Sequence, residues 1–187
     1  MVGHVCFGEV GKLLPARLIP VAIESPFAAR AGRSVEDHRL YLRHCMLDCL
    51  SRGEAPYASH NMYTLEGGGP LDDEDPLQRA LGIKAGLLWS SQSFRVACYV
   101  DFEMSGGMKA ARDHWVEIGM PVEYRTLPIG VSTNGELNYR AFLDKLVYRA
   151  KELPWLKDIL DRSFASAVLH GETIVSLFTP VSGPRST

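Results

Sequence analysis

The sequence predicts an α/β fold: a doubly wound, Rossmann-like parallel sheet with helices on both faces, plus a C-terminal helical extension. Apolar stretches typical of strands alternate with amphipathic stretches along residues 20–125, and such alternation indicates right-handed crossovers onto one parallel sheet. The stretch FRVACYV at 94–100 is apolar almost throughout, as expected of a strand covered on both faces. Polar turns follow the predicted strands, and ligands bind at that edge of such sheets.

The first strand and the first helix are predicted between residues 20 and 53. The apolar run PVAIE at 20–24 is the strand, and Pro26 ends it because proline has no N–H for a strand ladder. Ser34 and Asp37 have the spacing of a capping box, which marks the start of a helix. Gly53 suits the left-handed residue that follows the end of that helix.

A weaker strand is predicted at residues 55–59, and a long loop follows it. The loop, HNMYTLEGGGPLDDEDP at 60–76, contains three glycines, two prolines and several acids, which exclude regular structure. Loops of that length in compact domains are often functional. Asp75 then has the side chain of an N-cap, with proline directly after it, and predicts a helix over 76–89.

The last part of the predicted domain runs from the strand at 94–100 to a fourth strand at 121–125. Between them, Ser105 suits the N-cap of a helix that ends near Gly119. Two further amphipathic segments follow residue 128, and proline separates them. The chain therefore divides into an N-terminal arm at 1–19, an α/β domain at 20–127 and a C-terminal helical extension at 128–187.

The composition is that of an average soluble globular protein of 187 residues, with 46% hydrophobic and 22% charged residues. A formal net charge of -2 argues against duplex nucleic acid as a partner, because phosphate binding needs a basic excess. Neither a run of 18 apolar residues nor a signal-peptide pattern is present, which predicts a cytoplasmic protein and no membrane partner. The cysteines lack disulfide or zinc spacing and are interpreted as small buried side chains, so we expect no metal and no other cofactor.

The turn after the strand at 94–100 is the clearest candidate for ligand binding. Ser105, Gly106, Gly107 and Met108 begin a helix there, and the first N–H groups of a helix, with its dipole, attract a phosphate or carboxylate. Glycine also lets a ligand approach the backbone. A tight strand-to-helix turn without any ligand would explain the same residues.

Acidic side chains at strand ends are the candidates for catalysis. Glu24, Asp101 and Glu103 follow two different predicted strands. Cleaving an N-glycosidic bond needs a carboxylate that stabilises or traps a cationic sugar, and a proton donor for the leaving base. The alternative is structural: Asp101 caps a turn, and Glu24 pairs with an arginine.

Other polar and aromatic residues near the strand ends complete the predicted ligand site. His60 is a candidate acid or phosphate ligand, and Arg30 is a candidate phosphate clamp. Aromatic rings such as Phe27 stack on bases. For each of them a surface, ion-pair or packing role is the more common alternative. The full set of predicted ligand-binding residues is Ser25, Pro26, Phe27, Arg30, Ser59, His60, Ser105, Gly106, Gly107 and Met108.

Residues 20–127 resemble the nucleoside 2-deoxyribosyltransferase-like superfamily, and within it a branch seen in phages and bacteria. The stretches that carry the resemblance are AIESPF, YLRHCMLDCLSRGEAPYASHNMYT, GIKAGLLW and YVDFEMSGGMKAARDHWVEIGMPVEYRTLP. The resemblance implies a doubly wound fold, a nucleoside or nucleotide ligand and a homo-oligomer. It matches Glu24 to the turn near the sugar, Asp101 to an acid at the ligand edge, and Ser105 with Gly107 to a helix start that holds a phosphate.

One position departs from that superfamily. Its nucleophilic glutamate usually lies four residues after the glycine that matches Gly107, and here that position is Ala111. Three hypotheses stay open: a nucleotide-binding N-glycosidase or deoxyribosyltransferase that uses Asp101, Glu103 or Glu24 instead; a nucleotide sensor or sequestering protein without chemistry; and an interaction protein that works through its C-terminal helices.

Overall fold

The computed structural model describes residues 17–127, 147–148, 150–151, 156–158 and 161. Residues Ile19 to Leu127 belong to one compact unit, and the other described residues belong to a second one. The predicted arm at 1–19 and the predicted helices at 128–187 lie almost entirely outside the described residues. All the candidate site residues belong to the first unit.

Four parallel strands form the sheet of this unit, which confirms the predicted α/β fold. The strands are β1 (Ile19–Glu24), β2 (Glu54–Tyr57), β3 (Arg95–Tyr99) and β4 (Val122–Arg125), in the order β2-β1-β3-β4. The chain leaves β1 toward β2 and then crosses back to β3 on the other side. The carboxyl ends of β1 and β3 therefore form a topological switch point, where doubly wound sheets bind ligands.

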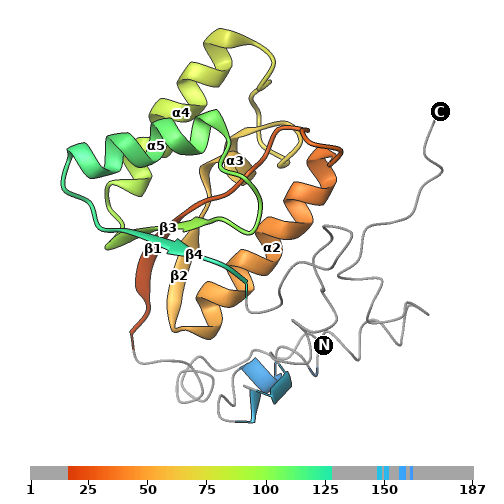
Figure 1. Cartoon of the computed structure of the whole chain (residues 1–187), viewed down its shortest axis with the longest axis vertical. Helices are drawn as coiled ribbons and strands as arrows, with labels where there is room; N and C mark the ends of the chain where they lie inside the picture. Colours follow the sequence, from red (N-terminus) through yellow and green to blue (C-terminus); the bar gives the residue numbers. More distant parts are fainter. Residues whose placement is uncertain (1–16, 128–146, 149, 152–155, 159–160, 162–187) are drawn as a thin grey trace, which may run out of the picture. The chain divides into compact units, whose positions relative to one another are not determined.

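Helices cover both faces of the sheet, as the alternation of elements predicts. Figure 1 shows α2 (Val35–Ser51) on one side of the sheet, and α4 (Pro76–Ser90) with α5 (Gly106–Glu117) on the other. α2 packs on β1 and β2, and α5 packs on β3 and β4. A switch point flanked by α4 and α5 therefore opens on the face opposite α2.

The predicted helix starts are confirmed in their hydrogen bonding. Ser34 and Asp37 form the full capping box of α2. Asp75 caps α4 through two backbone N–H groups, and Ser105 caps α5 through one. Gly53 follows α2 with a φ of 76°, a left-handed conformation that favours glycine. Local polar side chains thus set where these helices begin and end.

The prediction that residues 60–76 lack regular structure is wrong at their start. A short helix, α3 (Ser59–Tyr63), follows β2 and packs on α4. The Thr64 hydroxyl donates to the His60 carbonyl oxygen and accepts from the Gly67 N–H, so the glycine turn closes over the helix. A Cβ at Gly69 would lie 2.3 Å from the Met62 carbonyl oxygen. Gly67 and Gly69 therefore permit a close backbone contact with α3.

The core on the α4 and α5 side of the sheet is built around Trp115. This side chain is fully buried with Ala22 of β1 and with Val96 and Cys98 of β3. The thiols of Cys45, Cys49 and Cys98 are all free and buried, which confirms the interpretation of these cysteines as small core side chains.

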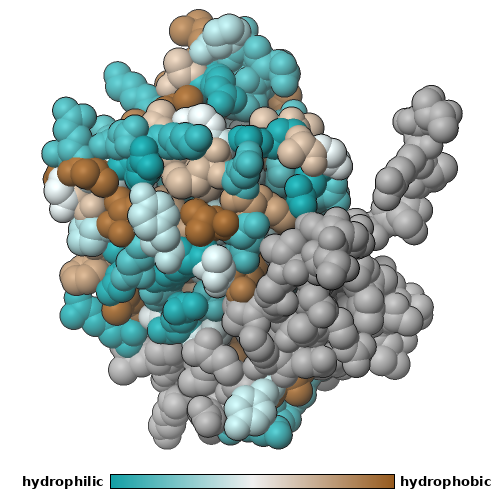
Figure 2. Space-filling view, in the orientation of Figure 1, coloured by the Kyte–Doolittle hydropathy of each residue, from teal (hydrophilic) through white to brown (hydrophobic). Residues whose placement is uncertain are grey.

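The surface of the unit mixes residue types. On the face that Figure 2 shows, hydrophobic residues occur in small groups between hydrophilic ones. Among the described helices, none has both the length and the apolar character that crossing a bilayer requires.

Candidate active site

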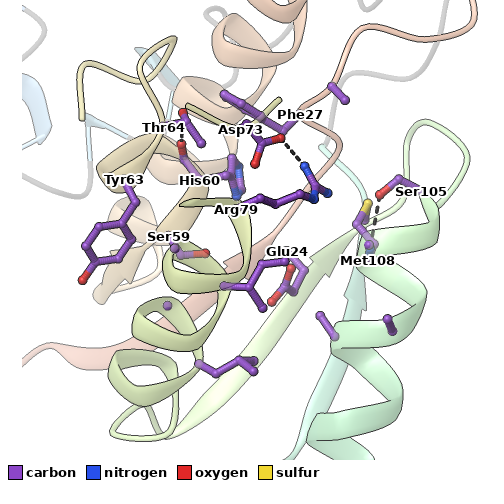
Figure 3. Close-up of a pocket in the computed structure, with 18 of the residues that line it drawn as sticks. Glu24, Phe27, Ser59, His60, Tyr63, Thr64, Asp73, Arg79, Ser105 and Met108 are labelled. Atoms are coloured by element: carbon purple, nitrogen blue, oxygen red, sulfur yellow. Dashed lines mark hydrogen bonds and ion pairs between the residues drawn. The ribbon is translucent and has the colours of Figure 1, made fainter. Parts of the chain in front are cut away.

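A cavity of about 560 Å³ opens at the switch point, between the end of β1 and the helices α3, α4 and α5. Figure 3 shows Glu24 at its centre, with Ser59 and His60 on one side and Ser105 and Met108 on the other. The three polar segments that the sequence places after different strands therefore meet in one place, as the parallel sheet requires. The predicted site residues that line the cavity are Glu24, Ser25, Phe27, Arg30, Ser59, His60, Ser105, Gly106, Gly107 and Met108.

Glu24 is the last residue of β1 and lies on the same face of the strand as Ala22, because side chains alternate along a strand. One of its carboxyl oxygens accepts a hydrogen bond of 3.2 Å from the indole N–H of Trp115. Burial raises the pKa of Glu24 to about 7, and the hydrogen bond from Trp115 opposes this only in part. A carboxyl group of this kind exchanges a proton near neutral pH, as general acids and bases do.

His60 and Ser25 form a pair beside this carboxyl group. The Ser25 hydroxyl lies 3.1 Å from Nε2 of His60, and the His60 ring stands 5.3 Å from the Phe27 ring. Burial, with a smaller contribution from His38 nearby, lowers the pKa of His60 to about 4. His60 is therefore a neutral imidazole at pH 7, suited to hydrogen bonding and to ring contact.

The start of α5 forms the opposite wall. Ser105 uses its hydroxyl to accept the N–H of Met108, so the N–H groups of Gly106 and Gly107 precede the first helical hydrogen bonds and can meet a ligand. A Cβ at Gly106 would meet no protein atom within 4 Å, and one at Gly107 only the Ser105 hydroxyl at 3.8 Å. Protein packing therefore does not require glycine at these two positions. Their effect is to leave free space at the edge of the cavity.

A third wall comes from the long loop and α4, and none of its residues is among the predicted site residues. The ion pair of Asp73 with Arg79 lies there, and Figure 3 shows Arg79 extending from α4 toward the start of α5. The length of the loop was the signal that could have found this wall. Its apolar part consists of Leu71, Ile83 and Leu87.

Three predicted site residues lie outside the cavity lining. Both carboxylate oxygens of Asp101 accept the Leu127 N–H at 3.0 Å, and one also accepts the Tyr41 hydroxyl at 2.6 Å. Glu103 points into solvent with 93% of its side chain exposed, 3.8 Å from Arg30, and Pro26 is buried. In this geometry Asp101 joins α2 to the residues after β4, and neither it nor Glu103 faces the cavity.

We expect replacement of Asp101 by alanine to lower the free energy of unfolding by about 2–4 kcal/mol, because the Tyr41 hydroxyl and the Leu127 N–H would lose a charged acceptor. Urea unfolding measures this change. If Asp101→Ala has normal stability but no longer binds ligand, the structural role is contradicted and Asp101 belongs to the ligand site.

Ala111, the position that the resemblance matches to a nucleophilic glutamate, lines the cavity, and alanine has no carboxylate. Within the described lining, the carboxyl groups belong to Glu24 and Asp73, and Asp73 is paired with Arg79. Glu24 is therefore the carboxyl group of this lining that has no ion-pair partner among the described residues. No group of three or more His, Cys, Asp or Glu side chains in the described part of the chain has the arrangement of a metal site.

Comparison with known proteins places the chain in a family without giving it an activity. No curated protein and no solved structure matches it. One family matches residues 19–125, which span β1 to β4 and contain the whole cavity. The chain belongs to this family, which is described as a domain of unknown function (DUF7768).

Proposed function

We propose that the protein binds a nucleoside or nucleotide in this cavity and acts on its N-glycosidic bond through Glu24, as an N-glycosidase or a deoxyribosyltransferase does. The convergence of the Glu24 carboxyl group, the His60 ring and the start of α5 on one cavity carries the proposal. The resemblance of residues 20–127 to the nucleoside 2-deoxyribosyltransferase-like superfamily supports the same class of ligand.

The chemistry of the walls matches the three parts of a nucleotide. The N–H groups at the start of α5 and the guanidinium of Arg79 suit a phosphate. Phe27 and the apolar side chains of α4 suit the flat face of a base. Figure 3 shows Glu24 below Phe27 and Arg79, with His60 to one side and Ser105 to the other, so a sugar held among these groups would lie near the carboxyl group. A volume of about 560 Å³ is within the range of small-molecule sites.

Ala111 favours a second candidate function, a nucleotide sensor or sequestering protein that binds without chemistry. The superfamily's usual covalent mechanism needs a carboxylate where Ala111 lies, so binding without turnover is the outcome if Glu24 does not act. The interaction protein that works through residues 128–187 stays a prediction, as does the homo-oligomer, because those residues lie largely outside the described ones and a single chain is described.

Ligand binding is tested by thermal unfolding of the full chain with the common nucleosides and their 5′-monophosphates. A ligand at one hundred times its Kd stabilises a protein by about 2.7 kcal/mol, which raises the Tm by several degrees at this size. We expect 5′-monophosphates to stabilise more than nucleosides, because only they reach the start of α5. The absence of any shift across both sets would contradict the proposed function.

We expect Gly107→Ala to show whether glycine is needed there for ligand binding or for the stability of the protein. The added methyl group meets no protein atom closer than 3.8 Å, so stability should stay equal or rise by up to about 1 kcal/mol. The same methyl group borders the cavity and should reduce the shift that 5′-monophosphates cause. A clear loss of stability without ligand would show instead that the backbone itself needs glycine there.

A further inference from the structure

We propose that Glu24 in its protonated form is the general acid that protonates the leaving base, and that Trp115 is the positioning residue that places its proton. This inference rests on the proposed nucleotide site and assigns the step that Glu24 performs there. It also assigns the reaction as hydrolysis without a covalent sugar intermediate.

The hydrogen bond from Trp115 decides which oxygen of Glu24 carries the proton. An indole N–H only donates, so the oxygen that it meets at 3.2 Å must accept. The carbonyl oxygen of a carboxylic acid is a stronger acceptor than its hydroxyl oxygen, so this bond favours the proton on the other oxygen. Among the described residues, no hydrogen-bond donor reaches that second oxygen, and Glu24 lines the cavity. Because Glu24 lines the cavity, an O–H on that oxygen is available to a ligand that binds there.

The surroundings of Glu24 keep that proton in place at neutral pH. Ala22, Val96, Cys98 and Trp115 form the apolar cluster on its side of the sheet, and burial there raises the pKa of Glu24 to about 7. A carboxylic acid in an apolar site beside a tryptophan is a known way to hold a proton for general acid catalysis.

Other titratable groups lie near Glu24 or around the cavity. They come from every neighbouring element: Tyr57 from β2, His60 from α3, the paired Asp73 and Arg79, Cys98 from β3, and His114 from α5. Burial raises the pKa of Cys98 to about 12 and also raises that of Tyr57, so neither gives up its proton readily. Arg30, at the rim, pairs with Glu103.

His60, the acid that the sequence suggested, lacks the second ring proton that would make it an effective acid. Its pKa of about 4 makes it a neutral ring at pH 7, and its Nε2 lies against Ser25. The His60 ring lies next to Phe27, and we infer that it helps to bind the ligand.

The proposed step balances as a hydrolysis. As the C1′–N bond breaks, its electron pair stays on the base nitrogen, and the Glu24 proton moves to the base. The sugar becomes an oxocarbenium ion, water adds to C1′, and the proton that this water loses returns to the Glu24 carboxylate. Ala111 offers no nucleophile for a glycosyl-enzyme bond.

Release of free base from nucleoside 5′-monophosphates, followed by chromatography between pH 5 and 9, tests this inference on the full chain. We expect base release to be highest below about pH 7 and to fall tenfold per pH unit above it, as Glu24 loses its proton. Glu24→Gln should lower the rate by about 100-fold or more while nucleotides still raise its Tm. Glu117→Gln, an exposed change on α5 outside the cavity, is the matched control and should leave the rate unchanged.

Trp115→Phe separates positioning from packing. Phenylalanine keeps an aromatic ring in the core but removes the N–H, and that N–H lowers the pKa of Glu24. The falling limb of the pH profile should therefore move to higher pH, a change that loss of packing alone does not produce. An unmoved limb would overturn the role of Trp115.

The outcomes distinguish this inference from the function on which it rests. Nucleotide-induced stabilisation without base release at any pH would overturn the acid role and leave the binding site standing. Base release that Glu24→Gln retains within a few-fold would also overturn it. Failure of both binding and release would overturn the proposed function itself.

Discussion

Replacing Glu54 by glutamine is expected to lower the free energy of unfolding by about 3–5 kcal/mol, because it removes one charge of a buried ion pair. Arg125 donates to both carboxylate oxygens of Glu54, at 2.6 and 2.8 Å, and both side chains are only 7% exposed. The neutral amide would leave the guanidinium buried beside a partner without charge. Glu123, at 2.6 Å from Arg125, is 41% exposed and compensates only in part.

The position of this pair explains why its loss should affect the whole unit. Glu54 begins β2 and Arg125 ends β4, and these are the two edge strands of the sheet. Arg125 also lies 3.6 Å from the sulfur of Cys49 in α2. The ion pair therefore connects both edge strands with the helix that covers one face. Local unfolding of one edge strand would break this contact with the other edge.

Urea unfolding of Glu54→Gln measures this effect, with Glu36→Gln as the matched control. Glu36 also pairs with an arginine, but its side chain is 57% exposed, and such pairs contribute about 0–1 kcal/mol. A double variant that replaces both Glu54 and Arg125 with apolar residues of similar volume should recover much of the loss. A loss below about 1 kcal/mol in Glu54→Gln would contradict the importance of the pair.

Local chemistry in the sequence was sufficient to predict the fold of this unit and the edge of the sheet at which the cavity opens. N-cap side chains at Ser34, Asp75 and Ser105 mark where three helices begin, because a cap depends only on residues within one turn. The apolar strand run at 94–100 and the strand–helix alternation then require a parallel sheet. The convergence of strand ends follows from that topology.

Long-range contacts explain what the sequence could not predict. Asp101 looks like a ligand residue because it follows a strand, yet Tyr41 and Leu127, far away in the chain, occupy its oxygens. Trp115 lies 91 residues after Glu24, and no local pattern shows that its N–H reaches that carboxyl group. The raised pKa of Glu24 depends on this tertiary environment.

The loop at 60–76 failed as a prediction for a related reason. Its three glycines were interpreted as breakers of regular structure, whereas Gly67 and Gly69 pack directly on the backbone of α3. The sequence alone does not show whether a glycine provides conformational freedom or allows close backbone contact. The length of the loop was therefore the one signal in the sequence that this loop and α4 form a wall of the cavity.

Glu24 should also make the stability of the unliganded protein depend on pH, because its pKa differs between the folded and unfolded states. The ordinary pKa is 4.5 and the folded-state pKa is about 7, so between these values the folded state binds more protons than the unfolded state. Stability must then fall as pH rises through this window. Each unit of pKa difference corresponds to about 1.4 kcal/mol, so ionisation of Glu24 can lower the free energy of unfolding by at most about 3 kcal/mol.

Glu24→Gln is expected to remove this pH-dependent loss. Near pH 4.5 the protonated carboxyl group and the amide both accept the Trp115 N–H, so wild type and variant should have similar free energies of unfolding. Above pH 7 the wild type must bury a charge and the variant does not, so the variant should be more stable by up to about 3 kcal/mol. Urea unfolding of both proteins at intervals from pH 4.5 to 8.5 measures the difference. A difference that stays constant over this range would show that Glu24 ionises at its ordinary pKa and would remove the physical basis for an acid in the cavity.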